Sequence, residues 1–181
     1  MRNSILGFGI VILTFLIACD KSDNDKPDNI IFKEIKKTVS VSKIDSINGI
    51  CKAVVFGISG NNSDGFKAYI TSNPMRVYCD AASQFLVHEN TNQILLLKRN
   101  SAVSENGTWK SNAEMLYLDQ FSGQGENFIG YRAVSFPGGT PIYYYGWIKI
   151  ELSPKNETLK IFSRADNQTE FNAIKTGQVE Y

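Results

Sequence analysis

The stretch Phe128–Arg164 reads FIGYRAVSFPGGTPIYYYGWIKIELSPKNETLKIFSR and contains three runs of aromatic and β-branched residues. Residues of these types favour β-strands, whereas the Pro, Gly, Ser and Asn residues between the runs favour turns. The order of strand, turn, strand, turn and strand predicts three neighbouring antiparallel strands joined by hairpin connections.

The middle run predicts a strand with two different faces, because successive side chains of a strand point to opposite sides of its sheet. One face carries Tyr144, Gly146, Ile148, Ile150 and Leu152. The other face carries Tyr143, Tyr145, Trp147, Lys149 and Glu151. We interpret the first face as part of the hydrophobic core and the second as a flat aromatic surface.

The turns on either side of this run set the expected strand registers. A four-residue turn at SPKN pairs Ile150 with Leu159, so that apolar side chains meet, and brings Arg164 to the aromatic face. A hairpin over PGGTPI places Arg132 against Trp147. Because this second loop is longer, it fixes its register less tightly.

Short runs elsewhere in the chain have the same strand-like composition and alternate with polar turns. They are Val39–Ile44, Ile50–Ser59, Phe66–Thr71, Met75–Cys79, Phe85–His88, Gln93–Arg99 and Met115–Leu118. Only Phe32–Lys37 has a weak helical pattern. Many short strands at this spacing favour a sandwich or barrel. We therefore predict an all-β fold, a single antiparallel β-sandwich domain over residues 32–181, with a jelly roll as one arrangement of its strands.

The N-terminus has the features of a bacterial lipoprotein signal. Arg2 precedes an apolar run from Ile5 to Ala18 that is too short to span a bilayer, as expected of a secretory signal peptide over residues 1–18. The run ends in LIAC, which resembles the lipobox of bacterial lipoproteins. That resemblance implies cleavage before Cys19, lipidation of its thiol and a membrane anchor. The alternative is an ordinary secretory signal with an incidental cysteine.

The polar segment that follows predicts a flexible acidic tether, which with the lipidated Cys19 occupies residues 19–31. The sequence DKSDNDKPDN has no aromatic or aliphatic side chain, so it buries too little surface to fold by itself. Its aspartates are similar to the acidic signal that sends some Gram-negative lipoproteins to the cell surface. The resemblance implies an outer-membrane lipoprotein exposed at the surface, with a periplasm-facing anchor as the alternative.

Three motifs in the C-terminal part of the chain occur together: GYR at 130–132, YGWIKIEL at 145–152 and AIKTGQ at 173–178. The combination resembles a signature of secreted or lipid-anchored bacterial β-proteins of unassigned function. It implies an exported all-β domain and carries no information on activity.

Charge and composition exclude some classes of function. Removal of the signal takes away Arg2 alone among the charged residues, so the mature chain has equal numbers of basic and acidic residues. A neutral chain without a basic run gives no electrostatic basis for binding nucleic acid. The 43% hydrophobic and 12% aromatic residues argue against a disordered stalk.

Two cysteines remain in addition to Cys19. Cys51 and Cys79 are candidates for a disulfide bond in an oxidising compartment, and two buried free thiols are the alternative. Because they do not form a Cys-x-x-Cys motif, we assign them no catalytic role.

The sequence predicts no catalytic residues, no metal site and no cofactor. His88 is the only histidine, which leaves no second imidazole for a zinc site, and the Gly-x-Ser-x-Gly motif of many hydrolases is absent. Carboxylate pairs of the glycosidase type meet only in the folded chain, so a glycan-acting hydrolase stays open as an alternative.

Four residues are candidates for ligand binding: Trp109, Arg132, Tyr145 and Trp147. Three of them belong to the predicted aromatic face, and Trp109 lies in the predicted loop NGTWK. Aromatic rings flanked by hydrogen-bonding groups suit the apolar faces of sugar rings. The other interpretation, which we favour for the aromatic face, is that another part of the protein covers this face and makes it core.

The favoured hypothesis is a non-catalytic, lipid-anchored module that binds or displays a glycan or a protein at the cell envelope. A hydrolase and a structural accessory subunit of an envelope complex are the alternatives.

Overall fold

The structure is a computed structural model that describes residues 29–40, 51–57, 65–72, 75–78, 83–111, 116–155 and 158–179. The predicted signal peptide, the predicted lipidation site Cys19 and nearly all of the predicted tether lie outside these residues, and so does Cys79.

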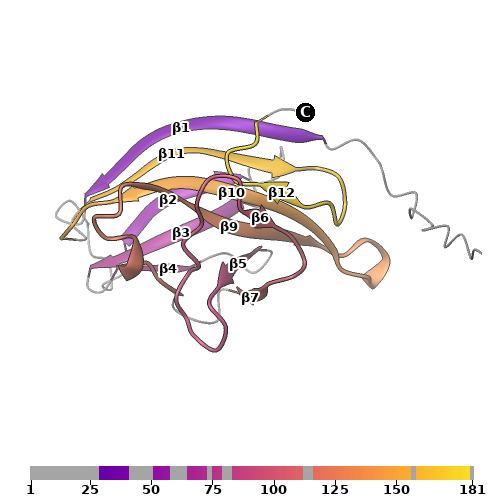
Figure 1. The fold of residues 1–181 in the computed structure, drawn as a ribbon. Helices are drawn as coiled ribbons and strands as arrows, with labels where there is room; N and C mark the ends of the chain where they lie inside the picture. Colours follow the sequence, from indigo (N-terminus) through magenta and orange to yellow (C-terminus); the bar gives the residue numbers. More distant parts are fainter. Residues whose placement is uncertain are drawn as a thin grey trace, which may run out of the picture.

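A six-stranded antiparallel sheet forms the larger layer of the fold. Its strands are β1 (Ile30–Ser40), β5 (Ser83–Val87), β7 (Thr108–Ser111), β9 (Glu126–Ser135), β10 (Ile142–Leu152) and β11 (Thr158–Asn167). They lie in the order β1-β11-β10-β9-β5-β7, and every neighbouring pair is antiparallel. Figure 1 shows β1, β11, β10 and β9 side by side as one long curved layer. Strands β9, β10 and β11 are the three that the stretch Phe128–Arg164 predicts.

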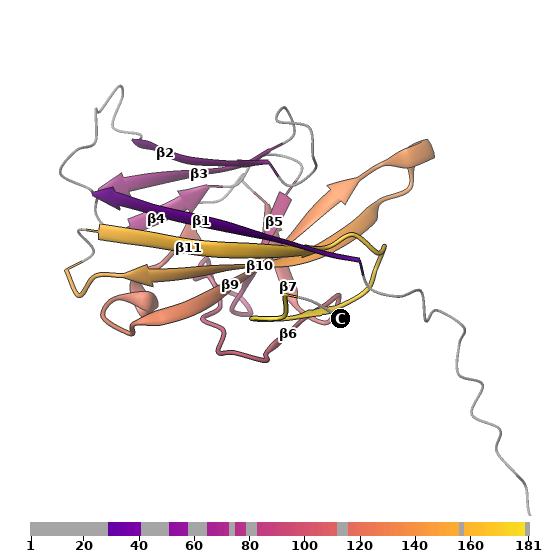
Figure 2. The same cartoon turned by 90° about the horizontal axis from the view of Figure 1, so that it is seen from above.

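A four-stranded sheet and a short two-stranded sheet complete the fold. The four-stranded sheet has the order β2-β3-β4-β8 and consists of β2 (Cys51–Gly57), β3 (Gly65–Ser72), β4 (Met75–Tyr78) and β8 (Leu116–Tyr117). Figure 2 shows β2, β3 and β4 together beside the long strands. The two-stranded sheet pairs β6 (Ala102–Val103) with β12 (Ile174–Lys175).

The only helical segments in the described part of the chain are two 3-10 turns, η2 (Asp119–Phe121) and η3 (Pro137–Gly139). The prediction of an all-β, antiparallel, sandwich-like fold is therefore confirmed.

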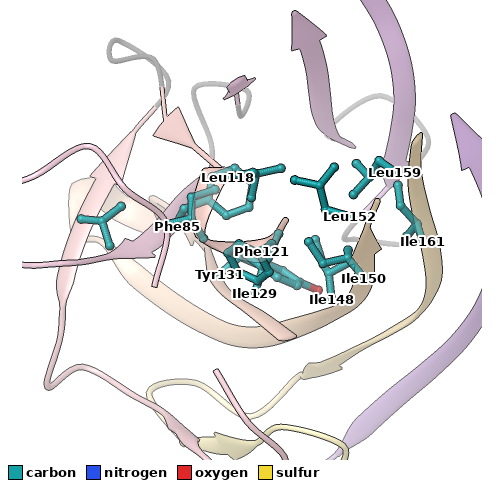
Figure 3. Close-up of a cluster of buried hydrophobic side chains, with 12 residues drawn as sticks. Phe85, Leu118, Phe121, Ile129, Tyr131, Ile148, Ile150, Leu152, Leu159 and Ile161 are labelled. Carbon is teal, nitrogen blue, oxygen red and sulfur yellow. The ribbon is translucent and has the colours of Figure 1, made fainter. Parts of the chain in front are cut away.

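Both faces of β10 are buried, and they belong to two separate hydrophobic clusters. Ile148 and Ile150 lie in the first cluster, whereas Tyr145 and Trp147 lie in the second. The predicted division of this strand into two faces is confirmed. The first cluster, drawn in Figure 3, also contains Phe85, Leu118, Phe121, Ile129, Tyr131, Leu152, Leu159 and Ile161.

The short β6–β12 sheet packs against the second face of β10. Val103 of β6 and Ile174 of β12 are buried in the second cluster together with Tyr145 and Trp147. A sheet that is apolar on both faces needs a cover on both sides, since exposed apolar area is unfavourable in water. The aromatic face is therefore interior, as in the interpretation favoured above.

The observed registers differ from the predicted ones by two residues at both hairpins. Ile150 pairs with Ile161 rather than Leu159, and Arg132 pairs with Tyr145 rather than Trp147. A shift by two residues keeps side chains on their predicted faces, because the period of a strand is two. At the β10–β11 hairpin the error comes from the turn, because the last pair is Leu152 with Leu159 and the connection between the two strands is longer than SPKN.

A β-bulge changes the face of the second half of β11. The register with β10 shifts after Ile161, which leaves Phe162 as an extra residue. Beyond the bulge, Arg164 lies opposite Ile148, on the face of the first cluster. The prediction that placed Arg164 on the aromatic face is wrong, because one extra residue reverses the alternation of side chains.

Two local predictions are also wrong. Phe32–Lys37 is not helical but part of β1, where a bulge with Lys36 at a φ of 49° turns Ile35 onto the first cluster. Because the bulge interrupts the alternation of the strand, the apolar residues of this segment are spaced in the sequence as they would be on a helix. The run Gln93–Arg99 forms isolated bridges rather than a strand, with Ile94 and Leu97 as the bridging residues.

Candidate functional site

Trp147 lies within the covered face and does not reach solvent. Its side chain is 1% exposed, and its indole N–H donates a hydrogen bond of 3.2 Å to the main-chain oxygen of Gln178. Its ring packs edge-on against Phe128, with a centroid separation of 5.3 Å. Tyr145 is 0% exposed. Neither ring presents a free face to a ligand in this structure.

Trp109 and Arg132 meet at the border of the same face, where both are half-buried. Trp109 is on β7, not in a loop as the NGTWK motif predicts. The guanidinium carbon of Arg132 lies 4.7 Å from the centroid of the Trp109 ring and 4.0 Å from that of Tyr143. Trp109 also contacts Tyr145 at a ring separation of 5.7 Å. The structure thus brings Trp109, Arg132 and Tyr145 together, whereas Trp147 lies in the same buried cluster as Tyr145 but is not paired with Arg132.

Strand pairing explains why these side chains meet. Arg132 on β9 pairs with Tyr145 on β10 and with Gln84 on β5, so the three side chains form one row across the sheet. The Nε of Arg132 donates a hydrogen bond of 2.6 Å to Oε1 of Gln84. This bond fixes the guanidinium in the orientation in which it covers Tyr143. We call Gln84, Trp109, Arg132, Tyr143 and Tyr145 the Arg132 cluster.

Among the described residues no carboxylate forms an ion pair with Arg132, although Glu105 is near enough to act electrostatically on Tyr145 of the cluster. Burial lowers the pKa of Arg132, an effect that the neighbouring Tyr143 and Tyr145 partly oppose. The guanidinium remains charged at neutral pH, because its ordinary pKa is so high. Burial also raises the pKa of Tyr145, so its phenol stays protonated at neutral pH.

Two polar groups of the cluster have no hydrogen-bond partner within the described part of the chain. The indole Nε1 of Trp109 is buried and donates to no acceptor there. The buried hydroxyl of Tyr145 makes no hydrogen bond of good geometry, and its nearest polar neighbour is the Arg132 guanidinium, with which it interacts electrostatically. Buried polar groups are usually satisfied, so these two groups mark the cluster as a place where a ligand could supply the missing partners.

A second polar group of residues lies on the opposite face, in the first cluster. Arg164 and Asp166 are both buried, and Nη1 of Arg164 is 3.4 Å from Oδ2 of Asp166. Burial raises the pKa of Asp166 well above its ordinary value. The sequence gives no signal for this pair, because its face depends on the bulge at Phe162.

The remaining sequence candidates have local roles or lie outside the described residues. Nε2 of His88 is 3.0 Å from Oε1 of Gln120, whose amide nitrogen in turn bonds the oxygen of Ile94. Cys51 is the first residue of β2, but Cys79 is not described, so the disulfide stays a prediction. Among the described residues, no group of three His, Cys, Asp or Glu side chains is placed to hold a metal ion. No helix in this part of the chain is long and apolar enough to cross a membrane.

Comparisons of the chain with protein-family models, with curated proteins and with solved structures gave no match. Function is therefore inferred from the geometry of the Arg132 cluster and from the sequence motifs.

Proposed function

We propose that this protein is a lipid-anchored, non-catalytic module of the bacterial outer membrane that binds a glycan at the Arg132 cluster. The observation that carries the proposal is the stack of the Arg132 guanidinium against Trp109 and Tyr143, with no carboxylate of the described chain paired to it.

The chemistry of the cluster favours a glycan with acidic groups. A guanidinium presents a planar fork of N–H donors that matches the two oxygens of a carboxylate. Nε of Arg132 donates to Gln84 and the guanidinium also interacts with the Tyr145 hydroxyl, which leaves its remaining outer donors for a ligand. Of the adjacent rings, Trp109 and Tyr143 are half-buried and supply the flat apolar surface that suits a sugar ring, whereas Tyr145 is buried.

The proposed location rests on the N-terminal sequence. The LIAC motif supports lipidation of Cys19, and two or more acyl chains give stable anchoring. The acidic residues that follow support display at the cell surface. Loss of a lipid label in a Cys19→Ala variant is the expected result, and a label that persists would contradict the anchor.

A binding assay with the soluble fragment of residues 20–181 tests the glycan proposal. We expect acidic polysaccharides to bind and their neutral counterparts to bind more weakly. Arg132→Lys keeps the charge but loses the planar stack, and we expect it to weaken binding at least about tenfold, corresponding to about 1.4 kcal/mol. Arg99→Lys is the matched control, because Arg99 is exposed and outside the cluster. Equal binding by the two folded variants would contradict the proposal.

A further inference from the structure

The chain enters the fold at a defined point on the rim of the six-stranded sheet. The main-chain oxygen of Asn29 accepts a hydrogen bond of 2.7 Å from the N–H of Gln168. The N–H of Asn29 donates to Oγ1 of Thr169 at 3.2 Å. The start of β1 is therefore fixed to the segment that follows β11.

Exposed aromatic side chains gather at the same end. Phe171 lies in the segment after β11, is 49% exposed and packs against Tyr143 at a ring separation of 6.0 Å. Phe136 precedes the turn of the β9–β10 hairpin and is 64% exposed. Figure 2 shows this hairpin extending beyond the other strands, at the end where β1 begins. At the start of β1, Ile31 and Phe32 are exposed as well.

The backbone holds Phe171 in this outward position. Its φ of 60° lies in the left-handed region, which is uncommon for a bulky residue. Its N–H donates a hydrogen bond of 2.9 Å to the main-chain oxygen of Tyr143. A strained conformation that persists in a folded protein is often tied to function, and here its effect is to expose a ring.

We propose that the end formed by Asn29, Phe136 and Phe171 lies on the membrane, with the two phenylalanine rings in the lipid interface. This inference rests on the proposed anchor at Cys19. The ten residues from Cys19 to Asp28 span at most about 35 Å, so the anchor keeps this end close to the bilayer. Phenyl rings gain from leaving water at the apolar boundary of such a surface.

The charged side chains at this end indicate which kind of lipid it contacts. Glu170 precedes Phe171 and Lys33 follows Phe32, and both are exposed; burial and, to a lesser extent, Glu170 raise the pKa of Tyr144. A basic patch would attract anionic lipids, but an acidic side chain beside the ring does not. The contact is therefore apolar, and we expect it to form equally well on zwitterionic phosphatidylcholine.

Fluorescence quenching by brominated lipid tests the inference in the full lipid-anchored protein. Phe136→Trp and Phe171→Trp variants are placed in phosphatidylcholine vesicles with bromine on the acyl chains. Lys155→Trp is the control, because Lys155 is exposed in the turn after β10, at the opposite end of the strands. Relative to the unmodified protein, we expect loss of the added fluorescence for the first two variants and none for the control.

The other possible results of this experiment lead to different conclusions. If the protein co-floats with the vesicles but neither introduced tryptophan is quenched, the inference is overturned while the anchor stands. If unquenched variants form concentration-dependent dimers, a second copy occupies this end instead of lipid. If the protein does not co-float and Cys19→Ala changes nothing, the anchor itself is wrong and the inference falls with it.

Discussion

The indole N–H of Trp147 donates its hydrogen bond to the main-chain oxygen of Gln178, across 3.2 Å. The two residues belong to two of the C-terminal motifs, YGWIKIEL and AIKTGQ. Two residues before Gln178 in the second motif, Thr176 is fully buried, and its hydroxyl donates to the main-chain oxygen of Lys98 at 2.5 Å. In this chain the two motifs therefore meet in a structural contact that closes the covered face.

Removal of residues 177–181 should therefore expose Trp147. The truncated protein loses the hydrogen bond and part of the cover of the ring, and we expect it to be destabilised by about 1–3 kcal/mol. In a Trp109→Phe background, Trp147 is the single tryptophan. Its emission should shift to longer wavelength and become accessible to acrylamide. Unchanged emission and unchanged urea unfolding would contradict this role of the C-terminal segment.

The sequence predicts the central strands well, because their alternation is long and regular. Over Ile142–Leu152 the pattern assigns the correct residues to each of two faces. It does not predict what covers the second face, since β6 and β12 have two residues each and show no periodicity. It also misses the bulge at Phe162, which depends on pairing with neighbouring strands.

Gly146 is expected to be the least tolerant glycine of the central strands. A Cβ placed there would lie 2.4 Å from Cζ of Tyr131 and 2.7 Å from the main-chain oxygen of Ala165. Neither a buried ring nor a backbone oxygen can move aside easily, so Gly146→Ala should destabilise the protein by about 1–3 kcal/mol or more. Thermal or urea unfolding measures the effect.

A second variant separates this clash from a general effect of losing a glycine. Adding Tyr131→Leu to Gly146→Ala removes the ring that the new methyl group meets. We expect the double variant to lose less stability than the sum of the two single variants, because the sites are in contact. Gly125→Ala is the control for backbone strain alone, as its Cβ meets nothing within 4 Å while its φ is +69°. Strict additivity would contradict the steric explanation.

The sequence predicted part of the Arg132 cluster, because the strand pattern places Arg132 of β9 on the same face as the aromatic residues of β10. It could not find Gln84, whose strand β5 joins β9 only in the folded chain. Nor could it separate Trp147 from Arg132, since their distance depends on a register that the loop length does not fix.

Gln84 offers a test that separates stability from binding. Gln84→Leu removes the acceptor of Arg132 Nε and leaves a partly buried donor unpaired, at a cost of about 1–3 kcal/mol in unfolding free energy. Gln84→Glu keeps an acceptor in place and should retain stability, but its charge neutralises the guanidinium. We therefore expect Gln84→Glu to weaken binding of acidic glycans more than neutral ones. If Gln84→Glu binds acidic glycans as well as the unmodified protein does, the guanidinium charge is not what the ligand recognises.

Asp166 should make folding stability fall as the pH rises above about 4. Its pKa is raised by burial in the folded state, so the folded chain holds this proton more tightly than the unfolded chain does. Its contribution is therefore fully present below the unfolded pKa and is lost as the pH rises through the folded pKa. A gap of one pH unit between the two pKa values corresponds to about 1.4 kcal/mol.

The difference in stability between the unmodified protein and Asp166→Asn isolates this effect, because asparagine has a similar shape and does not titrate. Urea unfolding from pH 4 to pH 8 should show the two proteins closest at low pH and Asp166→Asn increasingly favoured as the pH rises. Glu151→Gln is the control. Its partner Lys160 is 2.9 Å away at the surface, and such exposed pairs contribute only about 0–1 kcal/mol. A difference that instead grows in favour of the unmodified protein would show that Asp166 is ionised and that its pairing with Arg164 outweighs the effect of burial.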